Sequence, residues 1–160
     1  MRGPEGSAAA EFALVLPVLA LLLFGTIEVG RALHDYQLVD KSVRSATRYL
    51  SRAPVSCPAG FDVLDEANAR NLALTGTVDG SGDYLLKYWT QPSTIIIPNP
   101  CLTPIDNSAN TWRGAFDGAA EFYRATIIAQ VPIFLEFGSS WLGNMSVDVV
   151  VRHEEVVFGE

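Results

Sequence analysis

The segment from Gly6 to Arg31 constrains this chain more than any other feature. It contains an uncharged run from Phe12 to Ile27, made mostly of Leu, Val, Ala and Phe. The stretch from Ser7 to Ile27 would extend about 31 Å as an α-helix, at roughly 1.5 Å per residue. The hydrocarbon core of a bilayer is about 30 Å thick. The segment is therefore long enough to cross a membrane once, and the rest of the chain would fold as a domain attached to it.

Two residues are unusual for a plain membrane span. Glu11 places a carboxylate close to one end of the apolar run, where an unpaired charge is costly and marks a candidate functional residue. Pro17 lies inside the run and removes one helical hydrogen bond, which predicts a bend there. The alternative role for Glu11 is a carboxylate that reaches the lipid headgroups without a protein partner.

The apolar segment has three possible interpretations. A cleaved secretory signal peptide usually has a basic start, a shorter apolar run and a small-residue cleavage site, and no A-x-A motif follows the run here. A simple signal anchor explains the length but leaves Gly6, Glu11 and Pro17 without a role. The third interpretation rests on the residues that surround Glu11.

The order Gly6-Ser7-Ala8-Ala9-Ala10-Glu11-Phe12, followed by an apolar helix, resembles the class III signal of type IV pilins and pseudopilins. More narrowly, AAAEFALVLPVLALLLFGTIEVGR resembles the TadE-like family of the tight-adherence (Flp, type IVb) pilus system. The resemblance covers roughly residues 3–50. It implies a minor pilin or pseudopilin that takes part in pilus assembly, is structural rather than catalytic, and carries no cofactor.

The resemblance also implies roles for individual residues. A prepilin peptidase would cut between Gly6 and Ser7, which makes Glu11 the fifth residue of the mature chain. The Glu11 carboxylate would pair with the free amino group of Ser7 in a neighbouring subunit, because opposite charges attract strongly where the dielectric is low. Glu11, Phe12 and Pro17 would together serve assembly and the register of packed helices.

Partners and location follow from the same resemblance. The implied partners are the prepilin peptidase, sibling pseudopilins, the major Flp pilin, the inner-membrane pilus platform and the lipid around residues 7–27. The chain would lie in the bacterial inner membrane, with a cytoplasmic N-terminus and a periplasmic C-terminal domain, and would enter the pilus or its tip. The flanking charges favour the opposite orientation, because nearly all the nearby basic residues follow the apolar run.

The sequence divides into a leader, a membrane helix, an amphipathic continuation of that helix, and an extracytoplasmic domain. These parts span residues 1–6, 7–27, 28–52 and 53–160. In the third part, apolar side chains recur every three or four residues, which predicts one apolar helical stripe. The stripe consists of Val29, Leu33, Tyr36, Val39, Val43, Ala46 and Leu50. Pro54 favours a helix end just before it; the alternative is a hinge near Gly25 or Gly30.

The domain over residues 53–160 mixes helix and strand patterns. A second helix is predicted over 61–74, an edge strand over 94–97 between prolines, and two strands over 121–131 and 146–158 that pair antiparallel. Residues 132–142 are predicted as a short helix or a buried loop. The predicted fold class is α+β and pilin-like, with the long N-terminal helix packed on an antiparallel sheet of three to five strands.

A hairpin is predicted around the polar sequence Asp79-Gly80-Ser81-Gly82-Asp83, with strands over 74–78 and 84–90. The alternating acids of this sequence also resemble the start of a calcium loop. Because Thr90 stands where such a loop needs an acidic residue, the turn is preferred.

Cys57 and Cys101 are the two cysteines of the chain. An even pair in a domain expected outside the cytoplasm predicts one disulfide, and two buried free thiols are the alternative. A metal site is not expected, because no C-x-x-C motif occurs and His34 and His153 are far apart in sequence.

Charge and motifs narrow the function class. Residues 53–160 hold five Lys or Arg against thirteen acids, and an acidic domain repels phosphate backbones, so nucleic acid is not an expected partner. No catalytic motif occurs, and Glu154 and Glu155 would point to opposite faces of a strand. An enzyme is therefore not predicted. The alternatives to a pilus role are a membrane-anchored periplasmic binding protein outside any fibre, and a secreted binding module.

Overall fold

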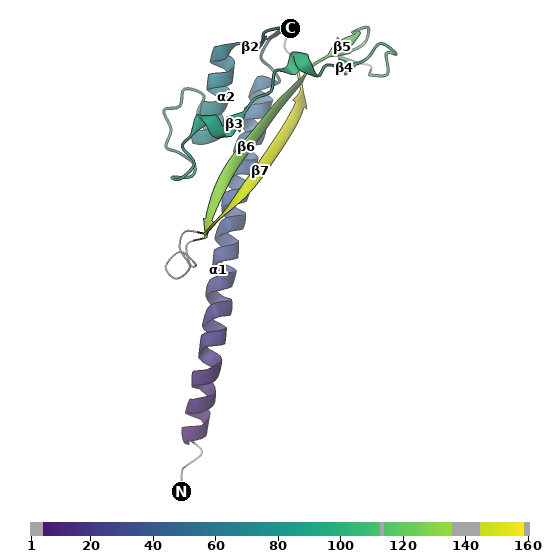
Figure 1. Ribbon diagram of the computed structural model, residues 1–160. Coiled ribbons are helices and arrows are strands. Elements are labelled where there is room, and N and C mark those ends of the chain that lie inside the picture. The colour runs from purple at the N-terminus through teal and green to yellow at the C-terminus, as the bar shows by residue number, and fades with distance from the viewer. Residues whose placement is uncertain (1–4, 113, 136–144, 159–160) are drawn as a thin grey trace. The chain divides into compact units, whose positions relative to one another are not determined.

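The computed structural model describes residues 5–112, 114–135 and 145–158. The chain forms two compact units, one of residues 1–35 with 133–147 and one of residues 36–132 with 148–160. The fold is α+β, as predicted, with a long N-terminal helix and antiparallel sheets (Figure 1). The short elements are β1 (Val55–Ser56), β2 (Gly60–Phe61), η1 (Pro92–Thr94), β3 (Ile95–Ile96), η2 (Pro100–Leu102), β4 (Ile105–Asp106) and β5 (Glu121–Phe122).

Helix α1 spans Glu5–Leu50 without interruption. It is 46 residues long, which corresponds to about 69 Å. The alternative of a hinge near Gly25 or Gly30 is wrong, because both glycines lie inside the continuous helix. Pro17 is also inside it, and a bend at Pro17 stays a prediction. After Leu50 the chain tightens into a turn, in which the Ala53 N–H donates to the Leu50 carbonyl, before Pro54 stops the helix.

Helix α2 spans Val63–Thr75 and confirms the second predicted helix. Its start is capped by the Asp62 carboxylate, which accepts a hydrogen bond from the Leu64 N–H at 2.8 Å. Its end is set by Gly76, whose φ of 75° places it in the left-handed region and whose N–H donates to the Leu72 carbonyl. Both ends are thus encoded locally.

The main sheet has the strand order β3-β6-β7, with β6 over Arg124–Leu135 and β7 over Met145–Val156. β3 is an edge strand, as predicted, and pairs antiparallel with β6 through Ile95 opposite Ala129. The arrows of β6 and β7 run in opposite directions in Figure 1, which confirms their antiparallel arrangement. The prediction for residues 132–142 is wrong as far as the structure describes it, because 132–135 continue β6; residues 136–144 lie outside the described part.

The predicted hairpin over residues 74–90 is wrong. Residues 74–75 complete α2, and 84–90 form an irregular segment in which Leu86 and Trp89 are buried. The Trp89 indole N–H donates to Thr94 Oγ1 at 2.9 Å, which holds this segment against the core. The apolar residues of this segment suggested a strand in the sequence, but in the structure they hold a loop against the core. The turn at Asp79 is present, and its carboxylate accepts hydrogen bonds from Ser81.

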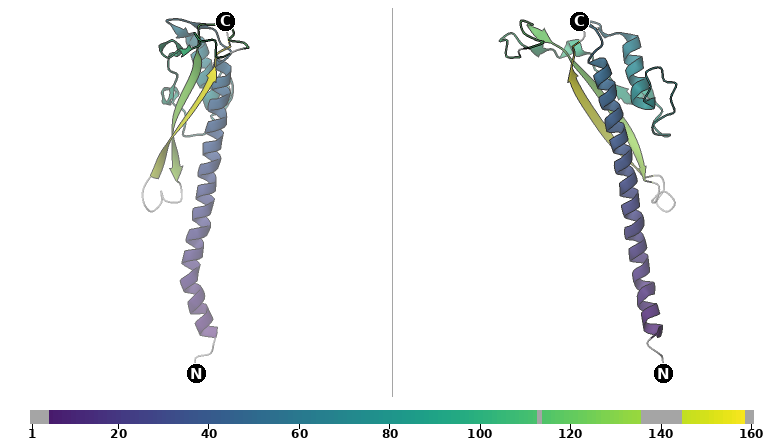
Figure 2. Two further views of the ribbon diagram at one scale, coloured as in Figure 1. Left: turned by 90° about the vertical axis from the view of Figure 1, so that its right-hand side faces the viewer. Right: turned by 180° about the vertical axis from the view of Figure 1, so that it is seen from behind.

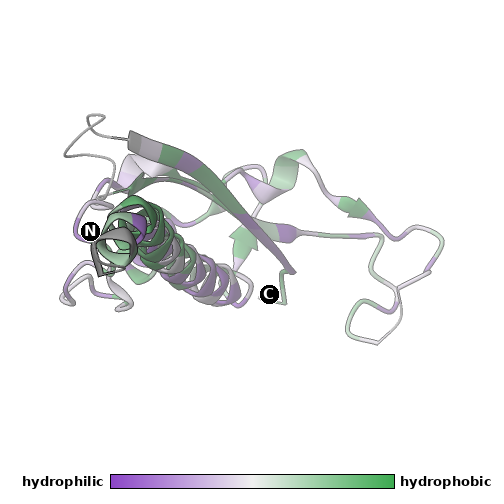
Figure 3. Cartoon of the chain, turned by 90° about the horizontal axis from the view of Figure 1, so that it is seen from below, coloured by the Kyte–Doolittle hydropathy of each residue, from purple (hydrophilic) through white to green (hydrophobic). Residues whose placement is uncertain are grey.

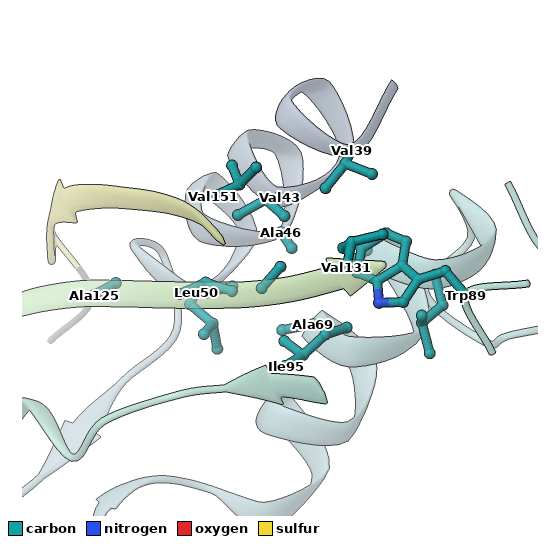
Figure 4. Packing of buried hydrophobic residues seen from close by; sticks show 14 of the residues in the cluster. Val39, Val43, Ala46, Leu50, Ala69, Trp89, Ile95, Ala125, Val131 and Val151 are labelled. Carbon is teal, nitrogen blue, oxygen red and sulfur yellow. The ribbon is translucent and has the colours of Figure 1, made fainter. Parts of the chain in front are cut away.

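The core of the second unit forms where one face of α1 meets the sheet and α2 (Figure 4). The C-terminal half of α1 contributes Val39, Val43, Ala46 and Leu50, all at most 1% exposed. Several of the facing residues of β6 and α2 are small, since Ala125, Ala129, Ala69 and Ala73 are fully buried, and on β6 the alanines alternate with the larger buried Ile127 and Val131. Small side chains allow the elements to approach closely, and Trp89, which is 1% exposed, fills the space at one end.

Cys57 and Cys101 form a disulfide, as predicted. The S–S distance is 1.99 Å and the Cα atoms lie 5.7 Å apart. The bond joins the β1–β2 turn to η2, and the Asn99 side chain supports it by donating to the Pro58 carbonyl at 3.0 Å and accepting from the Cys101 N–H at 2.9 Å. The Pro-rich connection, which has little regular structure, is thereby tied to the end of α1.

Val43→Ala should destabilise the folded chain by about 2 kcal/mol, because it opens a cavity at a fully buried position. Val29→Ala is the matched control, since Val29 lies on the same predicted stripe but is 59% exposed. The measurement is urea unfolding of the full chain in detergent, followed by tryptophan fluorescence. Equal effects of the two substitutions would contradict the described packing of α1.

Reduction of the disulfide, or replacement of both cysteines by serine, should cost about 4 kcal/mol in the chain-entropy model for a loop of 44 residues. The measurement is the unfolding midpoint with and without reductant. The double serine variant should not respond to reductant. A wild-type midpoint that reductant leaves unchanged would contradict the predicted contribution.

Candidate functional site: the exposed apolar segment of the first helix

The N-terminal half of α1 exposes its apolar side chains. Large apolar residues from Phe12 to Ile27 are between 46% exposed, at Phe24, and 78% exposed, at Leu14. Figure 3 views this end of the helix from below and shows hydrophobic residues around it. A continuous apolar surface of this extent needs lipid or other apolar helices around it. The segment is therefore a candidate interaction surface rather than part of the folded core.

This part of α1 meets the length and composition requirements of a membrane span. The candidate span within Ala8–Leu50 contains an 18-residue window of mean hydropathy 2.4, none of it buried. The Thr26 hydroxyl donates to the Leu23 carbonyl at 2.8 Å, so this polar group is satisfied inside the helix. The helix is long and apolar enough to act as a membrane anchor.

Glu11 is exposed within the apolar segment. Its carboxylate forms no hydrogen bond or ion pair with any side chain that the structure describes. Residues 7–15, which cover one turn of the helix on either side, include no lysine or arginine. Among the described residues Glu11 has no cationic partner, so lipid headgroups, a new amino terminus and another chain are candidate partners for its charge. Phe12, the next residue, is 61% exposed and contributes to the apolar surface.

The predicted processing residues Gly6 and Ser7 lie in the first turn of α1, which begins at Glu5. Residues 1–4 of the predicted leader lie outside the described residues. N–H groups in the first turn of a helix have no acceptor within the helix. Opening the chain at the bond between Gly6 and Ser7 therefore breaks few hydrogen bonds.

The predicted apolar stripe of residues 28–52 divides into two parts. Val29, Leu33 and Tyr36 are 59%, 56% and 41% exposed, whereas Val39 is 1% exposed. The regular spacing runs through both parts, so spacing alone does not locate this change. Only the tertiary structure shows which members of the stripe belong to the core.

A polar contact that sequence reasoning missed links α1 to β7. The His153 Nε2 atom lies 2.8 Å from Asp40 Oδ1, and both side chains are partly buried. His34, by contrast, is 75% exposed and lies 3.4 Å from its neighbour Asp35. The only sequence signal for the His153 contact is its position on the face of β7 that also carries Val151, and that signal does not identify the partner.

Glu154 and Glu155 have separate partners, as expected for neighbours on a strand. Glu155 lies 3.7 Å from Arg48 and accepts from the Ser51 hydroxyl on the side of α1, while Glu154 pairs with Arg124 of β6 at 2.7 Å. The two carboxylates therefore do not form an acid pair. Among the described residues, no group of three or more His, Cys, Asp or Glu side chains is arranged to hold a metal ion.

The Asp79 turn is closed by its own hydrogen bonds. The Ser81 N–H donates to the Asp79 carboxylate at 3.2 Å and the Ser81 hydroxyl donates at 2.9 Å. These bonds stabilise the ionised form and hold the pKa of Asp79 below its usual value. They account for the spacing of polar residues that suggested a calcium loop.

The part of the chain that is similar to a known protein family lies within the same helix, α1. The sequence model of one family, described as TadE-like protein, matches residues 6–48. This segment is TadE-like. The TadE-like match covers the exposed apolar part of α1 and most of its buried part, and it indicates a protein associated with the Tad pilus. No curated protein and no solved structure matches the chain.

His153→Ala should destabilise the folded chain by about 1 kcal/mol, because it removes the hydrogen bond to Asp40 Oδ1 and leaves the partly buried Asp40 carboxylate with only Arg44 as a partner. His34→Ala is the matched control and should change the free energy of unfolding by less than about 0.5 kcal/mol, since its side chain is exposed. A double-mutant cycle with Asp40→Ala measures the coupling. Coupling near zero would contradict a stabilising contact.

Proposed function

We propose that this chain is a minor pilin or pseudopilin of the Tad (Flp, type IVb) pilus, processed by a prepilin peptidase and structural in role. The observation that carries the proposal is the exposed apolar helix of the TadE-like segment, in which Glu11 pairs with none of the side chains that the structure describes. A helix of this kind is stable in lipid, and it also offers a continuous apolar surface to the helices of other pilus subunits.

The proposed division of the chain follows the helix. Residues 1–6 are a leader, 7–27 the transmembrane and assembly segment, 28–52 its amphipathic continuation, and 53–160 the extracytoplasmic domain. Cleavage between Gly6 and Ser7 would create an amino group one helical turn before Glu11. A carboxylate and an ammonium group are each costly in lipid, and pairing lowers that cost. In an assembled fibre, the pair between neighbouring chains would fix the axial position of each helix.

The proposed orientation places residues 53–160 in the periplasm. The disulfide between Cys57 and Cys101 supports this placement, because disulfides persist in oxidising compartments. The basic residues after the apolar run favour the opposite orientation. In the second unit, however, Arg44 and Arg48 lie near Asp40 and Glu155, which partly offsets their charge. The proposed partners are the prepilin peptidase, sibling pseudopilins, the major Flp pilin and the platform in the inner membrane.

The proposal predicts that the chain isolated from host membranes begins at Ser7. Intact mass and N-terminal sequencing measure this directly. Gly6→Val should retain residues 1–6, because a prepilin peptidase requires the glycine that the resemblance assigns to it. A wild-type chain that keeps residues 1–6 would indicate a membrane-anchored binding protein instead, and a chain that begins beyond Phe24 would indicate a secreted one.

Glu11→Gln tests the assembly role separately from processing. The variant should be cleaved but should be depleted from sheared pilus fractions, because a neutral amide does not pair with the Ser7 ammonium group. Glu28→Gln is the control, since it removes an acid at the other end of the same apolar run and has no role in the proposal. Equal recovery of both variants in the pilus fraction would contradict the assembly role of Glu11.

A further inference from the structure

A groove runs between α1 and α2 on the surface of the second unit. One end is a hollow of about 490 Å³ lined by Ser45, Arg48, Tyr49, Arg52, Ala53, Pro54 and Asp65. The other end is a more apolar hollow of about 230 Å³ lined by Leu38, Lys41, Ser42, Ser45, Leu72, Gly76 and Leu85. Ser45 lines both hollows, so they adjoin along α1. We call this surface the α1–α2 groove.

The α1–α2 groove is cationic although the whole chain has a net charge of −7. Lys41, Arg48 and Arg52 line it, and Lys41 and Arg52 form no ion pair within the described part of the chain. Arg48 lies 3.7 Å from Glu155 and is 63% exposed, so this ion pair compensates its charge weakly. The Asp65 carboxylate accepts a hydrogen bond from the Tyr49 hydroxyl at 3.1 Å. The groove therefore presents positive charge beside apolar surface.

A loop of the opposite character lies between β4 and β5, and the structure describes its residues 107–112 and 114–120. The Asn107 side chain organises it by donating to the carbonyls of Trp112, Phe116 and Ala119, at 3.3, 3.0 and 2.9 Å. Its amide oxygen also accepts from the Trp112 N–H at 2.9 Å. A single buried amide thus fixes the shape of the loop. We call the described part of this loop with its two flanking strands, residues 105–112 and 114–122, the aromatic arm.

The aromatic arm exposes an indole ring and three carboxylates, and the sequence over 105–122 holds one arginine, Arg113, against these three acids. Trp112 is 56% exposed, and its ring packs edge-on against Phe122 at 5.9 Å. Asp106 and Glu121 lie directly opposite each other on β4 and β5, an arrangement that is unfavourable for like charges. Neither carboxylate, nor that of Asp117, pairs with a cation among the described residues. Each carboxylate accepts one hydrogen bond near the loop, Asp106 from the Ser108 N–H, Asp117 from the Asn110 side chain and Glu121 from the Tyr123 hydroxyl. A cationic partner would add the charge compensation that these neutral donors do not give.

We propose that the aromatic arm of one molecule docks in the α1–α2 groove of a second copy of this chain. The charges are complementary, and the arm supplies an aromatic side chain to a groove with an apolar end. Within the second unit, α2 lies on one side of α1, and the arm extends to the other side from the end of β6 and β7 (Figure 1; seen from behind in Figure 2). The arm therefore points away from the groove of its own molecule. The occupant is therefore a neighbouring molecule.

The proposed contact joins two different surfaces and is heterologous. Each docked pair leaves one groove and one arm free, so the contact extends a row of molecules unless the geometry closes a ring. Both surfaces belong to the second unit near the C-terminal end of α1, which suits neighbours whose helices run in the same direction. The contact goes beyond the proposed pilus role and does not require Glu11 or cleavage.

The test uses the full chain in phosphatidylcholine vesicles at low protein density, with the photo-crosslinker p-benzoylphenylalanine in place of Trp112. Illumination should link this probe to residues 38–54 or 65–85 of a second, mass-labelled copy, as mapped by mass spectrometry. Arg52→Glu in the labelled copy should reduce the cross-link yield roughly tenfold, because it sets like charges against each other. Lys87→Glu is the matched control, since Lys87 is also exposed and lines neither hollow.

A charge exchange makes the test specific to the proposed pair of surfaces. The probe-bearing copy also receives Asp117→Lys, and its cross-link yield with the Arg52→Glu copy is measured. This yield should be higher than the yield between a probe-bearing copy that keeps Asp117 and the same Arg52→Glu copy. The proposal is overturned if the probe links only to lipid or to another protein surface. It is also overturned if Arg52→Glu and Lys87→Glu have the same effect. The variants leave residues 1–35 intact, so these outcomes do not bear on processing or pilus recruitment.

Discussion

Burial of one face of the C-terminal half of α1 is the interaction on which the rest of the second unit depends. Val43 and Leu50 of α1 are fully buried against a sheet whose central strand presents Ala125 and Ala129 at the contact. Apolar area removed from water is the main stabilising term in such a small domain. The same helix continues toward its N-terminus as an apolar rod that the fold does not cover. One helix therefore carries two apolar surfaces. Its C-terminal half is buried in a protein core, and its N-terminal half is left exposed by the described residues.

Polar contacts border this core and fix how α1 meets the last strand. His153 contacts Asp40, and Glu155 contacts Arg48 and Ser51. These alternate residues lie on one face of β7, and both contact α1 or the turn that follows it. These contacts define a register between two elements that are more than one hundred residues apart in sequence. The disulfide from Cys57 to Cys101 has a comparable role in the Pro-rich connection, where few backbone hydrogen bonds are available. The domain thus combines a small core with specific restraints at its border.

Sequence reasoning was accurate where the signal is local and failed where it is tertiary. The ends of α2 follow from Asp62 and Gly76, and the edge position of β3 follows from the prolines around it. The hairpin prediction failed because the apolar residues around Leu86 and Trp89 hold a loop against the core, and the apolar content of a short segment does not distinguish such a loop from a strand. The Asn107 network that shapes the aromatic arm was missed for a similar reason, since its acceptors are backbone carbonyls and any residue supplies those.

The sequence by itself determined the long apolar helix, the position of Glu11 near its end, the pairing of the two cysteines and the α+β class. Each of these follows from composition, spacing or a residue's own chemistry, which do not depend on the rest of the fold. Only the tertiary structure decided where along α1 burial begins, between Tyr36 and Val39, and which carboxylates lack a cation among the described residues. Burial and pairing depend on what other segments place next to a residue, and the helical stripe has the same spacing on both sides of that boundary.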